Sequence, residues 1–146
     1  MKWKSYLIVI ILAILFGIFS EIVVSQKEID GSIAQNIFKV LFLNMYVYAL
    51  LIITIIFELM GSNNFKTLTS SVIGNLLLFI FLFVIISILE CIFGKISNVY
   101  HNGHQTWKYS PKMIPFCNGY VSVVTSLYFT IFIFLYIRFI YPILFL

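Results

Sequence analysis

Residues 72–93 read V-I-G-N-L-L-L-F-I-F-L-F-V-I-I-S-I-L-E-C-I-F, a long apolar run that carries one carboxylate, Glu90, near its end. A hydrocarbon core about 30 Å thick requires about 20 helical residues, so this run is long enough to cross a bilayer. Its apolar residues are continuous rather than alternating, which favours a helix over a strand of a closed barrel. The run therefore predicts a transmembrane helix.

Three further apolar runs lie on either side of this one, at about residues 6–24, 40–60 and 119–146. The chain is 62% hydrophobic and 10% charged, and its mean hydropathy is +1.11. A soluble domain has about 25% charged residues, so these few charges cannot cover a water-exposed surface. The sequence predicts an all-α, multi-pass membrane protein in which residues 1–146 form a single transmembrane domain of four helices in the lipid bilayer.

The loops suggest how the chain is oriented. Four spans place loop 25–39 and the long polar loop 94–118 on one side, and both termini with loop 61–71 on the other. Lys2 and Lys4 favour cytoplasmic termini by the positive-inside rule, and we adopt that orientation. Lysines also occur on the opposite side, and the sequence does not identify the membrane. The basic residues are scattered singly, which argues against a nucleic-acid partner.

Cys91 and Cys117 lie near the two ends of the long loop. They are interpreted either as small apolar residues at helix ends or, where that side is oxidising, as a disulfide that closes the loop. Their spacing gives no metal signature.

A short motif suggests an internal repeat. Phe42-x-Asn44-x-Tyr46-Val47 recurs as Phe116-x-Asn118-x-Tyr120-Val121, and a glutamate, Glu21 or Glu90, ends the helix before each copy. Each unit is then a helix, a terminal Glu, a polar loop and a return helix. Two-span units keep the same orientation, so the pattern predicts two helical hairpins related as a parallel repeat about an axis along the membrane normal.

The two repeat glutamates are the main candidates for chemistry. A carboxylate within an apolar span costs roughly 2.5–3.5 kcal/mol on insertion scales, which calls for a structural or functional reason. Glu21 shares a stripe with the small residues Gly17 and Ser20, and Glu90 shares one with Ser87 and Gly94. Small residues on one face let helices approach closely, so both carboxylates are expected to point into the bundle. The alternative is that each only fixes helix position. The residues taken as candidates for binding a substrate or an ion are Glu21, Glu90, Asn44, Asn118, Trp107 and Tyr109.

Other charged pairs point to structure rather than chemistry. Glu58 and Arg138 are expected at similar depth near the termini, which predicts a structural ion pair.

His101-x-x-His104 is a weak metal pattern because Asn102-Gly103 between the histidines predicts a turn. No glycine loop that could hold a phosphate is present, so the chain itself is not expected to be an ATPase. We expect no metal site and no cofactor.

The motifs around the long loop resemble a known family. Glu90, then W-K-Y-S at 107–110, then the opening of the last span at 116–121, are similar to the second half of the permease-like, four-span proteins of the ABC-transporter type IV family. Arg138 and Pro142 resemble the close of that family's last span. In the first half, Gly17 and Glu21 match the family's G-W-x-x-E ending, but Ile18 stands in place of the Trp. Two other departures are Lys108 in place of an Asp, and the segment 44–46, which lacks the family's Cys-Pro. The resemblance implies a permease that works with a separate ATPase subunit.

These observations lead to three functional hypotheses. The first is a small transporter or permease-like subunit with an intramembrane carboxylate site, acting as a homo-oligomer or with a separate ATPase or membrane partner. The second is a non-catalytic assembly or regulatory protein whose polar residues specify helix packing. The third, an intramembrane enzyme that modifies lipid with the carboxylates as acid and base, is less favoured than a non-enzymatic role.

Overall fold

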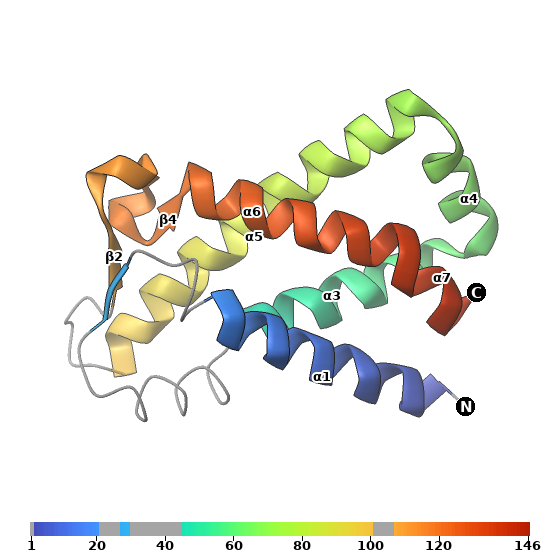
Figure 1. The fold of residues 1–146 in the computed structure, drawn as a ribbon, viewed down its shortest axis with the longest axis horizontal. Coiled ribbons are helices and arrows are strands. Elements are labelled where there is room, and N and C mark those ends of the chain that lie inside the picture. The colour runs from blue at the N-terminus through green and yellow to red at the C-terminus, as the bar shows by residue number, and fades with distance from the viewer. Residues whose placement is uncertain (1, 21–26, 30–44, 101–106) are drawn as a thin grey trace.

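The computed structural model describes residues 2–20, 27–29, 45–100 and 107–146, and within them it is mostly helical (Figure 1). The helices are α1 (Lys2–Phe19), α3 (Met45–Met60), α4 (Ser62–Ser70), α5 (Val72–Tyr100), α6 (Val123–Leu135), the π-helical η4 (Tyr136–Ile140) and α7 (Tyr141–Phe145). The short elements are β1 (Lys27–Ile29), β2 (Trp107–Tyr109), η2 (Pro111–Met113), β3 (Pro115–Phe116), η3 (Cys117–Gly119) and β4 (Val121–Ser122).

Three of the described helical segments are long and apolar enough to cross a membrane: Lys2–Phe19, Val72–Ile96 and Val123–Phe145. A fourth is added if α3 and α4, which meet at an angle of 103°, count as one bent span. Of the expected span 40–60, residues 45–60 form α3, and residues 40–44 lie outside the described residues. The chain is therefore an α-helical, multi-pass membrane protein.

The expected loop at residues 61–71 is instead occupied by a helix, α4. Gly61 breaks the chain with a positive φ of 83°, which costs glycine little. The next turn then forms around hydrogen bonds to the end of α3: Phe65 N–H donates to the Gly61 carbonyl at 3.0 Å, and Asn64 Nδ2 donates to the Met60 carbonyl at 3.0 Å. The prediction of a loop over residues 61–71 was wrong because these bonds support a short helix.

The ends of the other elements also differ from the expected spans. Helix α5 continues to Tyr100, beyond the expected end at Phe93. The last helical segment begins at Val123 rather than near Gly119. Helix α6 passes into the π-helical η4, in which Arg138 lies four residues before Pro142. Since Pro142 has no N–H, it cannot donate the hydrogen bond that the Arg138 carbonyl would accept in a regular α-helix.

The core consists of aromatic and aliphatic side chains from α1, α3, α4, α5 and the α6–α7 segment. The ring of Phe16 stacks on Phe132 with centroids 3.5 Å apart, and Tyr46 stacks on Phe129 at 4.0 Å. Val9 and Ala13, on the same face of α1, are 0% and 1% exposed. Burial of these side chains contributes about 25 cal/mol per Å² of apolar surface from which water is displaced. Together with close dispersion contacts, this burial holds α1 against the α6–α7 segment.

The molecule has two distinct ends (Figure 1). Both termini and α4 lie at one end, and the segment 107–122, here called the cap, lies at the other. Strand β1 of the first polar loop pairs antiparallel with β2 of the cap, with Glu28 opposite Lys108. Strands β3 and β4 form a second antiparallel pair that leads directly into α6. The two polar loops therefore meet on one side, as an even number of spans between them requires.

Much of the predicted repeat lies outside the described residues, including Glu21, Phe42 and Asn44. The tyrosine of each motif copy is buried, since Tyr46 and Tyr120 are both 3% exposed.

Candidate functional site

The central feature of the cap end is a buried carboxyl group. Glu90 lies on α5 and is 0% exposed. The hydroxyl of Tyr109 donates a hydrogen bond to Glu90 Oε1 at 2.6 Å. Tyr109 comes from β2 and is itself 1% exposed, so the cap supplies a donor that the apolar part of α5 lacks.

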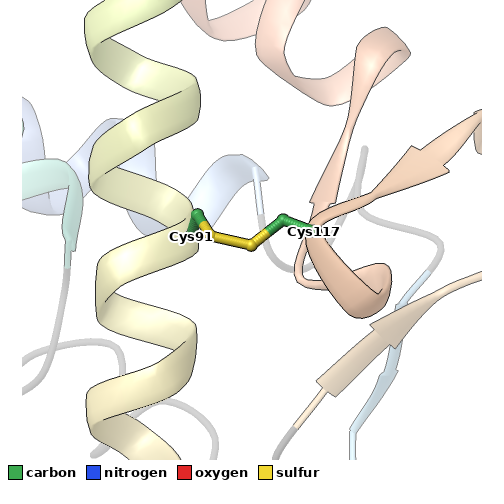
Figure 2. The surroundings of a disulfide bond; sticks show 2 residues. All are labelled: Cys91 and Cys117. Atoms are coloured by element: carbon green, nitrogen blue, oxygen red, sulfur yellow. A yellow bond between two sulfur atoms is a disulfide. The ribbon is translucent and has the colours of Figure 1, made fainter.

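A disulfide holds the cap on α5 beside this carboxyl group. Figure 2 shows Cys91, on the helix, joined to Cys117 in the cap. The two Cα atoms are 6.0 Å apart, a normal separation for a disulfide. Because Cys91 follows Glu90 directly in the chain, the covalent link fixes the cap next to the buried group. The pairing of the two cysteines, left open by the sequence, is thereby given by the structure.

Gly94 allows the cap to approach α5 closely. A Cβ atom at Gly94 would lie 2.5 Å from Cγ and Cδ1 of Tyr120, closer than carbon atoms pack. The aromatic ring of Tyr120 therefore rests directly on the helix backbone, one turn after Glu90. This contact and the disulfide place Glu90 and Cys91 under a cap that is attached at two points.

The turn that carries Cys117 has an unusual backbone. Cys117, Asn118 and Gly119 have φ values of 51°, 58° and 84°, and left-handed conformations of this kind favour Asn and Gly. A Cβ at Gly119 would meet Cγ of Lys108 at 2.8 Å. Asn118 thus serves the turn, with an exposed side chain, and the stem of Lys108 covers the glycine.

Buried hydroxyl groups lie along α5 and α6, which pack against each other. Ser87, three residues before Glu90, is 8% exposed, and Ser126 is 0% exposed. Their hydroxyl oxygens have no hydrogen-bond partner among the described residues. Ser122 caps α6, because its Oγ accepts from Thr125 N–H at 3.0 Å. The hydroxyl group that the structure places at the Glu90 carboxyl group is that of Tyr109, and a carboxyl group with such a partner can hold a proton or provide oxygen ligands for a cation.

The other predicted pair has different partners in the structure. Glu58 Oε1 lies 2.7 Å from Lys2 Nζ, and Tyr6 donates to Glu58 Oε2. Arg138 Nη1 instead donates to the carbonyl of Thr69 at 2.8 Å. The depth estimate put both charged groups near the termini, but it could not indicate which helices are neighbours. Helix α1 packs against α3, and that brings Lys2 to Glu58.

The remaining candidates are only partly described. Glu21 and Asn44, like the histidines at 101 and 104, lie outside the described residues. Trp107 pairs through its backbone with Ile29 in the β1–β2 ladder. Sequence reasoning named Gly94 only as a small residue on the face of Glu90, and Tyr120 only as part of the repeated motif. It did not predict that the two residues contact each other.

The fold defines a class, the α-helical multi-pass membrane proteins, and α5 carries a carboxyl group that is buried in the structure. A family model described as "Putative ABC-transporter type IV" matches residues 7–145. The chain belongs to this family, which confirms the resemblance found in its motifs. No curated protein and no solved structure is similar enough to the chain to count as a match.

Proposed function

We propose that this chain is the permease-like membrane subunit of a transport system, and that a separate ATPase subunit supplies the energy. Membership of the ABC-transporter type IV family supports a transporter-type membrane protein. The observation that carries the proposal is Glu90, which is 0% exposed on the strongly apolar helix α5. Intramembrane ionisable residues are rare and mark ion or substrate pathways.

The proposed site centres on Glu90 and Tyr109, with Glu21 as the corresponding carboxylate of the first hairpin. The pairing of β1 with β2 brings the two polar loops together on one side, which a parallel repeat requires. Four helices alone make a thin wall for a solute, so the path would form between copies of the chain or between the chain and a membrane partner.

The disulfide supports one orientation of the chain. Disulfides persist in oxidising compartments and are rare in the cytosol. We infer that the cap, with Cys91 and Cys117, faces away from the cytoplasm. Both termini and α4 would then face the cytoplasm, as Lys2 and Lys4 predict by the positive-inside rule.

Helix α4 is the element that this orientation offers to a cytoplasmic ATPase. Its apolar side is anchored, since Phe65 is 2% exposed and its ring packs edge-on against Phe57. Its other face is polar and exposed, with Asn63, Lys66 and Thr67. A rigid helix with a polar outer face is suited to a partner that assembles from the aqueous phase.

Affinity purification of the tagged chain in mild detergent tests the proposal. We expect an ATPase subunit in a fixed ratio to the chain. Lys66→Glu, on the exposed face of α4, should reduce its recovery, while the same charge change at the exposed Lys112 of the cap should not. Recovery of a homo-oligomer without any ATPase would contradict the proposal and favour the assembly or regulatory function.

A further inference from the structure

The cap exposes an apolar tip formed by Ile114, Pro115 and Phe116. Ile114 is 60% exposed and Phe116 is 40% exposed, and Pro115 between them is also exposed. Three adjacent apolar residues with their side chains outward are unfavourable in water. The segment before them is anchored, since Met113 is 8% exposed.

The hydrogen bonds of the tip fix its depth relative to the bundle. The N–H of Val123 donates to the carbonyl of Ile114 at 3.1 Å. Val123 is the first residue of α6 and of the apolar segment Val123–Phe145. Strand β3 also pairs directly with β4, with Phe116 opposite Val121. The tip therefore lies beside the start of a membrane span rather than above it.

The surface of α6 continues from the tip toward the bilayer. Val124 is 42% exposed and Leu127 is 41% exposed. An apolar helix of a membrane span exposes such residues to lipid. Ile114 is joined to the first residue of this helix by the backbone bond from Val123.

The backbone at Ile114 has a cost that an apolar environment would help to offset. Ile114 adopts φ 54° and ψ 68°, a left-handed conformation. This region is unfavourable for a β-branched residue, and such strain persists only where the surroundings maintain it. The turn is maintained by the N–H of Ile114, which donates to Pro111 O at 3.3 Å, together with the bond from Val123.

We propose that the Ile114–Phe116 tip is immersed in the lipid leaflet on the cap side and anchors the cap in the membrane interface. The proposed partner is phospholipid, with acyl chains against the tip. Lys112, two residues before Ile114, has an exposed side chain, and its ammonium group can reach the headgroup phosphates while its stem follows the apolar surface. This anchoring does not depend on what the protein transports.

Tryptophan fluorescence in vesicles tests the proposal. In a Trp3→Phe/Trp107→Phe background, Phe116→Trp places a single probe at the tip. Leu127→Trp is the lipid-facing reference, and Lys112→Trp is the shallow one. The vesicles contain phosphatidylcholine brominated near the start of its acyl chains. Formation of the Cys91–Cys117 disulfide, read by gel mobility without reductant, shows that each variant has folded.

We expect brominated lipid to quench Phe116→Trp to an extent comparable with Leu127→Trp and more than Lys112→Trp. Adding Ile114→Asn, which tolerates a left-handed backbone, should reduce that quenching while the disulfide still forms. The proposal is overturned if the probe at 116 is quenched by iodide in the aqueous phase and is no more sensitive to brominated lipid than the probe at 112.

Discussion

The hydroxyl of Tyr109 lies 2.6 Å from Oε1 of Glu90, although the two residues belong to different elements, the cap and α5. Both side chains are almost fully buried, at 1% and 0% exposure. A buried acceptor that loses its donor is left with an uncompensated desolvation cost. The cap and the buried carboxyl group of α5 are therefore expected to depend on each other.

Tyr109→Phe should lower the free energy of unfolding by about 1–3 kcal/mol, because it removes only the hydroxyl donor to Glu90. Thermal unfolding in detergent measures the loss. Tyr48→Phe is the matched control, since Tyr48 is 46% exposed on α3 and should tolerate the same change. Equal stability of the two variants would show that the Tyr109–Glu90 bond contributes nothing.

Replacing both cysteines by serine should destabilise the cap by roughly 3–4 kcal/mol, as expected when a cross-link with a sequence separation of 26 is lost. In the unmodified protein, maleimide-polyethylene glycol added to denatured, unreduced membranes should label neither Cys91 nor Cys117. Labelling should appear only after reduction. Free thiols in freshly isolated membranes would refute both the disulfide and the orientation inferred from it.

Gly94→Ala should displace the cap, because the new methyl group would lie 2.5 Å from Cγ and Cδ1 of Tyr120 and 2.8 Å from its Cβ. These atoms are next to the backbone of the cap and cannot move without it. Overpacking of this kind costs about 1–3 kcal/mol. Ile92→Ala, at a residue 46% exposed on the same helix, is the control and should cost less. Protease sensitivity of the cap in intact vesicles is the measurement, and an unchanged cleavage rate in Gly94→Ala would contradict the close contact.

Some of the fold could be predicted from local sequence. Apolar runs locate membrane helices because a bilayer requires length and low polarity, and the expected runs around residues 6–24, 72–93 and 119–146 correspond to α1, α5 and the α6–α7 segment. Helix α4 was missed because Gly-Ser-Asn-Asn is typical of a turn. Its hydroxyl side chains instead bond to carbonyls within the helix, as Thr69 does to Phe65 at 2.9 Å, and Phe65 is buried.

The site illustrates a second limit. Sequence reasoning selected Glu90 and Tyr109 separately, from the cost of an intramembrane charge and from a family motif. It did not give their hydrogen bond, the Cys91–Cys117 link or the partner of Glu58. Each of these depends on which elements are neighbours in space, and that is decided by packing between residues far apart in the chain.

ATP hydrolysis by the purified complex, reconstituted in vesicles, tests the central claim most directly. Glu90→Gln keeps the size of the side chain and an oxygen that can accept from Tyr109, so the cap and the complex should still assemble. If Glu90 belongs to the transport site, this variant should hydrolyse ATP at least about tenfold more slowly than the unmodified complex, which corresponds to about 1.4 kcal/mol. An assembled Glu90→Gln complex with an unchanged rate would show that the buried carboxyl group only supports the fold.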